Sequence, residues 1–505
     1  MAMFAISKLV PSAIAVAAAA ATTYNIKVKT EAQGDVEIVT KPFSFRGHLS
    51  VVTQQGDFQS TSNCEKHCTK MVRLVLCFVL FVVGAIGKEI VLIPDLLTDD
   101  QSSDIKAEIP QDIEVEKNDE IIPTSGCTIA VNGGLPEPQP LLIRPNSLNF
   151  FNPDRNGIIT LSENQQIELY CSGSFVAPFT NTRTLFATCQ GGSFLVNGVA
   201  TVFSTLACTG QVAHTARRTG QWCFDGSTHT EVGFNLAPNR FLVTHNVCHD
   251  EVVEATRYVY YQMTPSNMGW QRSFPRPSFI TGSFFNGRNV NSLYTQVIQK
   301  QTLAGILGQE VVDEMYALHT DAYLARGHLM ANTDNIFGSQ MRASFYFINA
   351  QPQFQVFNAG NWESIESGVK QFIADRNLEV EVYTGVHGIL SLRDKNNVFR
   401  QLFLDFDANG RGLIPVPEFY YRIVLHRPTN RGIVFIGINN PHATEADIQT
   451  RHIHCNDVSH NVDWIRWTNP GRTSILRGYS YACTVAEFRH VVTNLPPTVK
   501  EQEKN

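Results

Sequence analysis

Three short segments carry side chains whose chemistry suits a single hydrolytic site. Arg326-Gly327-His328 closes the first segment, Asn358 lies thirty residues beyond His328, and Glu366 follows eight residues later. A histidine can take a proton from water near neutral pH, and a carboxamide oxygen is a hard ligand suited to Mg²⁺. An arginine can hold two phosphate oxygens at once. These residue types would suit hydrolysis of a phosphodiester, with the magnesium ion stabilising charge on the phosphate and the leaving oxygen.

Two further polar residues extend this set. Lys370 follows Glu366 by four residues, so both side chains share one helix face and can point at one site. Between the first two segments lies Phe345-Tyr-Phe-Ile-Asn349-Ala-Gln-Pro-Gln353. Phe345 and Trp362 are expected in the core rather than stacked on nucleobases.

These segments resemble the DNA/RNA non-specific endonucleases of the ββα-metal (His-Me finger) fold. The resemblance rests on ARGH ending at His328, NAGNW beginning at Asn358, and Glu366, in that order and at those spacings. It covers residues 275–490. The longer strings LARGHL, FYFINAQPQ and FNAGNW are similar to secreted insect nucleases that degrade double-stranded RNA.

The resemblance implies a role for each matching residue. His328 would be the general base that activates the attacking water, and Asn358 the single protein ligand of Mg²⁺, with Mn²⁺ as a substitute. Arg326 would contact phosphate, and Glu366 would hold one of the water molecules of the ion. Lys370 and Asn349 would bind substrate or shape the site, with Asn349 in the strand facing the motif.

The chain departs from the family pattern in two places. The usual Asp before Arg-Gly-His is Ala325, and the Arg expected one turn after the Glu is Lys370, which keeps the charge but loses the bidentate fork. An arginine that the family supplies from upstream has no assigned match. Its candidates are Arg272, Arg276 and Arg288.

The elements that must position these residues suggest an α+β fold. Helical spacing of apolar residues covers 291–307 and 362–373, and strands are predicted at 344–348, 378–386 and 422–425. The expectation is a ββα-metal nuclease domain over 251–495 with a mixed or antiparallel sheet. A small β-rich, disulfide-containing domain over 126–250 is expected before it, because short apolar runs alternate there with turn signals. Residues 496–505 are expected to be a disordered tail.

The 505 residues are not expected to form the working protein in full. Met71-Val-Arg73, the apolar run 74–83 and the small residues before Lys88 have the parts of a secretory signal peptide over 71–87. Residues 1–70 would then be a gene-model extension or a leader. Residues 88–125 hold 3 Lys or Arg and 11 Asp or Glu, which indicates a linker or propeptide.

Charge and cysteine content agree with that division. The net charge of −6 excludes a strongly basic nucleic-acid coat protein, but it belongs to residues 88–125, so the remaining body can hold a basic groove. The chain has 11 cysteines, and eight of them follow residue 87. An even number suits a secreted disulfide protein. Eight cysteines allow 105 pairings, of which Cys455 with Cys483 is favoured.

Two other motifs are expected to carry no chemistry. Residues 405–410 imitate the start of a calcium loop, but Val416 stands where a bidentate Glu is needed, so a turn is predicted. His452-Ile-His454 resembles zinc ligands but lacks a partner pair.

The leading hypothesis is a secreted, Mg²⁺-dependent endonuclease that acts on double-stranded RNA and on DNA and RNA with low sequence specificity. Its partner would be nucleic acid, with no membrane after signal cleavage, and the oligomeric state stays open, a homodimer included. One alternative is a mitochondrial relative of endonuclease G that uses residues 1–30 as a transit peptide. A second is a nucleic-acid-binding protein whose catalysis has decayed, as Ala325 would suggest.

Overall fold

The computed structural model describes residues 126–237, 239–493 and 495–499, together with the backbone of four short strands between residues 29 and 48. The chain divides into two compact units, Met1–Lys117 and Asn118–Asn505. In the first unit, β1 (Lys29–Thr30) pairs with β2 (Val36–Glu37), and β3 (Lys41–Phe43) pairs with β4 (Arg46–His48). The expected leader 1–70, signal peptide 71–87 and acidic segment 88–125 otherwise lie outside the described residues.

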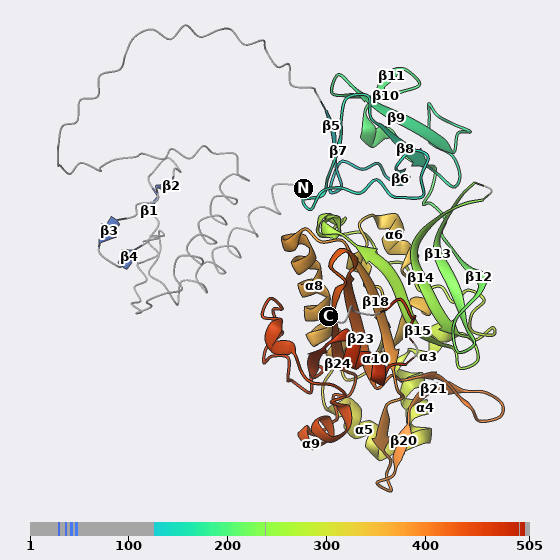
Figure 1. Cartoon of the computed structure of the whole chain (residues 1–505), viewed down its shortest axis with the longest axis vertical. Helices are drawn as coiled ribbons and strands as arrows, with labels where there is room; N and C mark the ends of the chain where they lie inside the picture. The colour runs from blue at the N-terminus through green and yellow to red at the C-terminus, as the bar shows by residue number, and fades with distance from the viewer. Residues whose placement is uncertain are drawn as a thin grey trace. The chain divides into compact units, whose positions relative to one another are not determined.

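An eight-stranded sheet forms the centre of the second unit (Figure 1). All its neighbouring strands are antiparallel, in the order β12-β13-β14-β15-β18-β23-β24-β25. The strands are β12 (Thr215–Phe224), β13 (Ser227–Ala237), β14 (Arg240–Asp250), β15 (Ala255–Met263), β18 (Val380–His387), β23 (Phe419–His426), β24 (Arg431–Ile438) and β25 (Ser480–Cys483).

A second, five-stranded sheet lies upstream in the chain, in the order β11-β10-β9-β8-β6. Its strands are β6 (Leu141–Ile143), β8 (Gln166–Tyr170), β9 (Thr184–Gln190), β10 (Ser193–Val196) and β11 (Val199–Thr201). The pair β5 (Cys127–Ala130) and β7 (Ile158–Leu161) stands beside it. In Figure 1 these strands lie at the end of the second unit opposite to the hairpin β19–β20.

Helices and three smaller hairpins complete the second unit. The hairpins are β16 (Leu324–His328) with β17 (Ala350–Phe354), β19 (Ser391–Arg393) with β20 (Phe399–Gln401), and β21 (Phe403–Phe406) with β22 (Gly412–Pro415). The α-helices are α3 (Val290–Leu293), α4 (Gln296–Leu307), α5 (Gln309–Ala317), α6 (Gly338–Ala343), α7 (Gln355–Phe357), α8 (Glu363–Arg376), α9 (Glu445–Asp447) and α10 (Val485–Val491). Single turns are η1 (Phe203–Thr205), η2 (Pro265–Gly269), η3 (Asn332–Asp334), η4 (Phe347–Asn349), η6 (Arg427–Thr429) and η8 (Ser459–Asn461), and wider π-type turns are η5 (Asn358–Trp362) and η7 (Ile448–His452).

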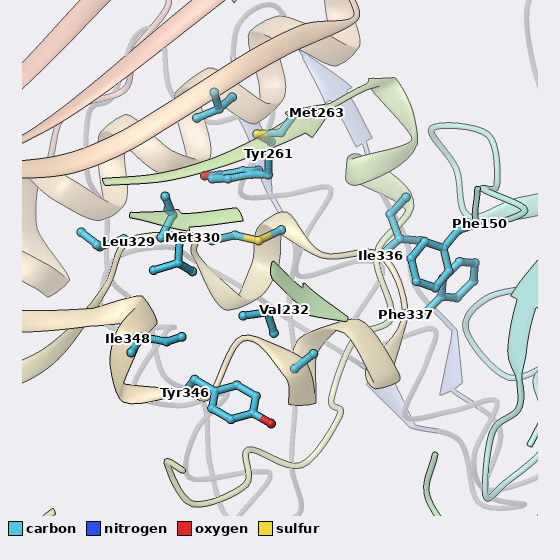
Figure 2. Packing of buried hydrophobic residues seen from close by; sticks show 14 of the residues in the cluster. Phe150, Val232, Tyr261, Met263, Leu329, Met330, Ile336, Phe337, Tyr346 and Ile348 are labelled. Atoms are coloured by element: carbon cyan, nitrogen blue, oxygen red, sulfur yellow. The ribbon is translucent and has the colours of Figure 1, made fainter. Parts of the chain in front are cut away.

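The sequence of β23 explains how the large sheet is buried. All its residues from Phe419 to Leu425 are buried, because both faces of the sheet are covered. Tyr420 and Val424 join the main core, whereas Tyr421 and Ile423 join a second cluster that packs on α10. Figure 2 shows part of the main core, where Phe150 from the upstream region meets Phe337.

All eight cysteines of the second unit are paired. The disulfides are Cys127–Cys189, Cys171–Cys208, Cys223–Cys248 and Cys455–Cys483. The favoured pairing of Cys455 with Cys483 is therefore confirmed. The α+β fold class and the presence of disulfides upstream of the main helices are confirmed as well.

Three local expectations differ from the structure. The predicted boundary at residue 250 falls inside the eight-stranded sheet, since β14 pairs with β15; the two sheets separate between β11 and β12 instead. Alternating patterns reveal strands but not the sheet that each strand joins. Residues 344–348 are not a strand, because Ser344 caps α6 and the strand begins at Ala350. Residues 496–499 are not a free tail, since Val499 is fully buried.

Candidate active site

The hairpin β16–β17 and helix α8 bring the predicted motifs into one ββα unit. The register of the hairpin places His328 opposite Ala350 and Arg326 opposite Pro352. The chain then passes through α7 into the π-type turn η5, where Asn358 is the first residue, and continues as α8 with Glu366 in its first turn. The three segments of the sequence motif are therefore consecutive parts of one local structure.

The glycine between Arg326 and His328 has a steric reason. A Cβ atom at Gly327 would lie 2.3 Å from Oε1 of Gln353 and 2.8 Å from the hydroxyl oxygen of Tyr420. The hydroxyl of Tyr420 donates a hydrogen bond of 2.9 Å to the backbone oxygen of Gln351 in β17. The space beside Gly327 is thus filled by side chains that lock the hairpin to the large sheet.

The NAGNW segment is held by its second asparagine and its glycine. A Cβ atom at Gly360 would lie 2.6 Å from the backbone oxygen of Arg477. The side chain of Asn361 donates to the backbone oxygens of Gly471, Arg472 and Gly478. Fully buried Trp362 packs edge-on against Tyr420, 5.4 Å between ring centroids. These contacts fix the turn in which Asn358 stands.

His328 ends β16 between two aromatic rings. Its ring centroid lies 5.0 Å from that of Phe279 and 4.9 Å from that of Phe345. Its Nε2 is buried and has no hydrogen-bond partner in the described part of the chain. Burial, with the positive charge of Arg276 nearby, lowers the pKa of His328 to about 3. The imidazole is therefore neutral at pH 7 and has a lone pair available to accept a proton.

Asn358 offers an unengaged oxygen. Its Nδ2 donates 3.2 Å to Oε1 of Gln355, which orients the carboxamide, and among the described residues nothing donates to its Oδ1. The side chain is partly exposed. A carboxamide oxygen that is oriented, accessible and free fits a hard cation such as Mg²⁺.

Glu366 is partly buried and has no hydrogen-bond partner among the described residues. Burial, and next to it the negative charge of Asp334, raises the pKa of Glu366 to about 8. The negative charge of Glu366 also contributes to the raised pKa of Tyr420. Glu366 therefore lies near Tyr420, whose hydroxyl is close to Gly327.

Arg326 is half-buried behind three aromatic rings. Its guanidinium donates 2.6 Å to Oδ1 of Asn291, its carbon lies 5.3 Å from the ring centroid of Tyr294, and its Nε is buried without a partner. Burial lowers the pKa of Arg326. Among the described residues no carboxylate pairs with it, so the guanidinium can take an anion.

Two of the predicted site residues, Asn349 and Lys370, form hydrogen bonds with the protein backbone. Asn349 is fully buried in η4 and not in the strand; its Oδ1 accepts from the backbone of Met330, and its Nδ2 donates to Met330 and Ser344. It therefore shapes the loop after His328 and has no free group for substrate. Lys370 is 8% exposed, donates 2.8 Å to the backbone oxygen of Thr333, and lies over the ring of Trp270.

The structure selects among the three upstream arginines. Arg288 is paired with Glu254 and Asp405 and is thereby occupied. Arg276 is exposed and lies close enough to His328 to lower the pKa of that histidine. Of the three, Arg276 is the one whose charge acts on His328, whereas Arg272 lines a cavity.

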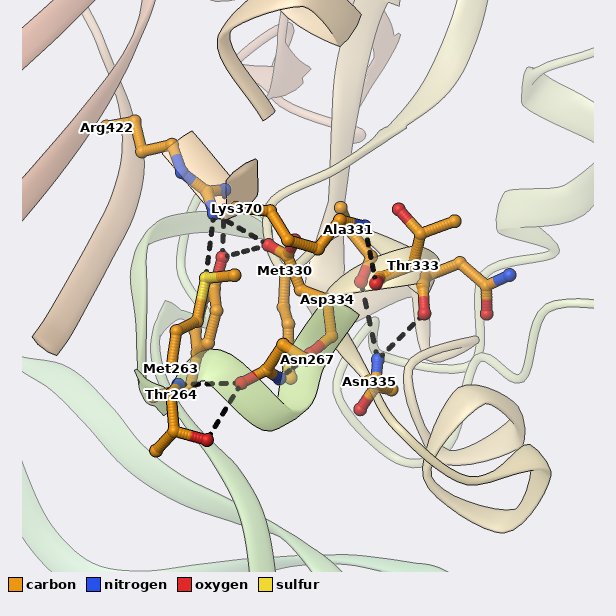
Figure 3. Close-up of polar contacts among 12 residues, drawn as sticks. Met263, Thr264, Asn267, Met330, Ala331, Thr333, Asp334, Asn335, Lys370 and Arg422 are labelled. Atoms are coloured by element: carbon orange, nitrogen blue, oxygen red, sulfur yellow. Dashed lines mark hydrogen bonds and ion pairs between the residues drawn. The ribbon is translucent and has the colours of Figure 1, made fainter. Parts of the chain in front are cut away.

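A buried ionic network behind the site has no counterpart in the sequence reasoning. Figure 3 shows Arg422 of β23, Asp334 of η3 and Lys370 of α8 around the loop that follows His328. The hydroxyl of Tyr261 and the guanidinium of Arg422 both donate to Oδ2 of Asp334, at 2.8 Å each. A lone Arg within the apolar strand 419–425 was the available signal, because a buried arginine needs an acidic partner.

The calcium-loop-like segment 405–410 and the pair His452 and His454 form ordinary structural contacts. Oδ1 of Asp407 accepts from the backbone of Asn409 and Arg411, as in an ordinary turn. Nδ1 of His452 lies 2.8 Å from Oε1 of Glu418. In the described ranges no group of three or more His, Cys, Asp or Glu could hold a metal ion. A single-ligand site at Asn358 is compatible with that result.

Residues 225–488 match the family model for DNA/RNA non-specific endonuclease. The chain belongs to this family. The matched region of this endonuclease homologue begins in the turn between β12 and β13, and so includes strands upstream of residue 251.

The chain is similar to two proteins that are named as salivary. A salivary endonuclease of Lutzomyia longipalpis is 26% identical over 255 residues, and the match covers 50% of the chain and 58% of that protein. The salivary protein Tsal1 of Glossina morsitans morsitans is 21% identical over 386 residues, covering 72% of the chain and 90% of that protein.

A solved structure of the EndoG/EndoGI complex also matches, with 15% identity and a TM-score of 0.26, covering 39% of the chain and 72% of the other. None of the helices in the described residues is both long and apolar enough to cross a membrane.

Proposed function

We propose that this endonuclease family member hydrolyses phosphodiester bonds in nucleic acids with little sequence preference, using His328 as general base and a single divalent cation at Asn358. The observation that carries the proposal is the ββα unit, in which a neutral histidine, a free carboxamide oxygen and a carboxylate without a partner follow one another. The family match adds that nucleic acid is the substrate class.

Each side chain has a defined task. The neutral imidazole of His328 takes the proton of the attacking water as the general base. Arg326 and Arg276 hold the non-bridging phosphate oxygens through charge-assisted hydrogen bonds. Asn358 would hold the cation with water completing its shell, and Glu366 would order that water. When bound, Mg²⁺ or Mn²⁺ stabilises the charge that develops on the phosphate and on the leaving oxygen.

Low sequence specificity follows from the groups available. The cationic groups assigned to the substrate are arginines, which contact phosphates and carry no sequence information. Double-stranded RNA is proposed as a preferred substrate on the likeness of LARGHL, FYFINAQPQ and FNAGNW to the insect nucleases. Secretion is proposed because eight cysteines form four disulfides, which persist in oxidising compartments. The signal peptide at 71–87 and the release of a chain starting at Lys88 belong to the same proposal.

The decisive experiment compares the full chain with two histidine variants. Long duplex RNA, plasmid DNA and single-stranded RNA are incubated with Mg²⁺ or with EDTA. We expect cleavage only with the cation, and a loss of about 10²–10⁴-fold in rate for His328→Ala, since general-base catalysis contributes that much. His460→Ala, at an exposed turn, is the matched control and should retain the parental rate. Full activity of His328→Ala would exclude this mechanism.

The same experiment separates the alternative functions. Binding of duplexes without cleavage of any substrate, with or without the cation, would support a decayed nuclease, for which Ala325 is the motivating departure. The mitochondrial alternative requires processing after residues 1–30, whereas the secreted form should begin at Lys88 or later. Sequencing the N-terminus of the native protein distinguishes these two outcomes.

A further inference from the structure

Two cavities that share the segment 271–273 are lined by residues of the upstream β-region and of the nuclease region. The first has a volume of ≈ 280 Å³ and is lined by Glu137, Arg272 and Arg342 among others. The second has a volume of ≈ 470 Å³ and is lined by Asn132, Asn156 and Arg272 among others. Residues 271–273 line both cavities, so Arg272 belongs to both linings. We call the two cavities together the junction cleft.

The walls of the junction cleft are fixed. The backbone N–H of Arg272 donates 2.8 Å to Oδ1 of Asn132, whose Nδ2 donates to the backbone oxygen of Trp270. Oε1 of Gln271 accepts 2.8 Å from the backbone of Gly338 and 3.2 Å from Nε2 of Gln139. The cleft is therefore built jointly by the upstream loops and by the segment leading to α6.

The junction cleft carries cations that no carboxylate neutralises in the described residues. Arg272 is exposed and only its backbone is hydrogen-bonded. Nε of Arg342 is buried without a partner. Glu137 is the acidic residue among the lining residues, and its carboxylate pairs with neither arginine in the described structure. An unpaired, partly buried guanidinium is a ready site for phosphate oxygens.

The junction cleft is also close to the reaction centre along the chain. Arg272 and Arg276 are four residues apart, a span of at most about 14 Å. The charge of Arg276 acts on His328, and Trp270, two residues before Arg272, contacts Lys370 of α8. One segment, 270–276, thus runs from the helix of the candidate active site, past the junction cleft, to the general base.

We propose that the junction cleft binds the phosphodiester backbone of the nucleic acid flanking the cleaved bond, with Arg272 and Arg342 as phosphate contacts. The upstream β-region would then be a wall of an extended substrate groove. This inference rests on the proposed function and names a second place on the same substrate. Phosphates of a duplex follow one another about every 3.4 Å of helix axis in each strand. A duplex held at His328 would therefore bring phosphates to the cleft within a few nucleotides.

The test uses the full chain with His328→Ala as a background that binds without cutting. Affinity for a 30-base-pair duplex, once as RNA and once as DNA, is measured by fluorescence anisotropy across a salt series. Arg272→Ala and Arg342→Ala should each weaken binding, and each should flatten the dependence of log K on log salt by about one unit. Arg272→Lys keeps the charge and should keep most of the salt slope. Arg393→Ala, on the distant hairpin β19–β20, is the control and should match the parent.

Cleavage separates the two proposals. In the otherwise wild-type chain, Arg272→Ala should raise the KM for long duplexes several-fold and raise the KM for a four-nucleotide substrate by less. Affinity and salt slope equal to the parent for both Arg272→Ala and Arg342→Ala would overturn the cleft proposal while leaving the nuclease intact. A wild-type chain that cuts nothing would overturn the proposed function, and the binding series would still report on the cleft. Because Arg342 is partly buried, thermal unfolding of its variant is measured alongside, and exposed Arg272 carries the test if that variant unfolds.

Discussion

Asp334 and Arg422 form an ion pair of 2.8 Å in which neither side chain is exposed to solvent. Asp334 ends the turn η3 shortly after His328, and Arg422 lies in the middle of β23. Tyr261 of β15 bonds to both of them, at 2.8 Å to Asp334 and 2.9 Å to Arg422. The pair therefore anchors the loop that follows the general base to the central strands of the large sheet.

Breaking this pair should destabilise the fold strongly. Asp334→Asn leaves the guanidinium of Arg422 buried without a compensating charge, and removing one partner of a buried pair costs about 3–5 kcal/mol. Urea unfolding should show this loss, whereas Asp407→Asn, which weakens the solvent-accessible pair with Arg411, should cost much less. The double variant Asp334→Asn/Arg422→Met should recover part of the stability. Equal unfolding free energies for the two single Asn variants would contradict the role of the buried pair.

Activity should rise with pH because of Glu366. The carboxylate must be ionised to accept hydrogen bonds from water, and its pKa is raised to about 8 by burial and by Asp334. At low Mg²⁺ we expect kcat/KM to increase up to tenfold per pH unit below pH 8 and to level off above it. Raising the Mg²⁺ concentration should move this rise in kcat/KM to lower pH, since a nearby cation favours the ionised form of Glu366. Glu366→Gln should be weakly active, and its kcat/KM should not rise with pH in this range. If the rise is unchanged in that variant, it is caused by the titration of another group.

Replacement of Asn358 should change the requirement for the cation. Asn358→Ala removes the free Oδ1, so we expect activity to fall by at least tenfold and the Mg²⁺ concentration for half-maximal rate to rise. Asn358→Asp keeps an oxygen at the same place and should retain more activity than the alanine variant. Asn409→Ala, at an exposed turn, serves as the control. The measurement is an initial rate against Mg²⁺ concentration, and identical curves for Asn358→Ala and the parent would exclude a cation at this residue.

Acid should destabilise the protein through buried neutral histidines. Burial lowers the pKa of His245 to about 3 and that of His249 to about 4, from 6.5 in the unfolded chain. Between pH 6.5 and those values the unfolded chain binds protons that the folded chain does not, so stability is full above pH 6.5 and is lost as pH falls. Each such group contributes a slope of up to about 1.4 kcal/mol per pH unit.

His245 allows that slope to be measured. Oγ1 of Thr244 donates 2.9 Å to the backbone oxygen of Val232, so toward the ring it accepts from Nδ1 of His245. Nε2 of His245 is buried without a partner, and protonation there gains none. His245→Asn can keep the hydrogen bond that Nδ1 makes to Thr244. Between pH 6 and 4 its unfolding free energy should fall less steeply than that of the parent, because the unfolded variant binds about one proton fewer. A decline as steep as that of the parent would assign the acid sensitivity to other groups.

The residues of the candidate site and the local backbone that holds them can be predicted from their spacing in the chain. The spacing of His328, Asn358 and Glu366 identified the ββα unit because consecutive elements need only short-range geometry to meet. Helices are predicted within a few residues of their observed bounds at 291–307 and 362–373, and the strand predicted at 378–386 matches β18. The family followed from the same residues, and the match over residues 225–488 confirmed it.

Tertiary structure decided what each polar residue is free to do. Asn349 and Lys370 were predicted to be site residues. In the structure the side chain of Asn349 forms hydrogen bonds with the backbone, and the ammonium group of Lys370 donates to the backbone oxygen of Thr333. No spacing rule predicts such bonds, because they join residues from separate elements. The tertiary fold likewise chose Arg276 over Arg288, joined β12–β14 to the large sheet, and placed Asp334 against Arg422. Burial and long-range pairing set the charge state of the site, and neither is visible until the chain has folded.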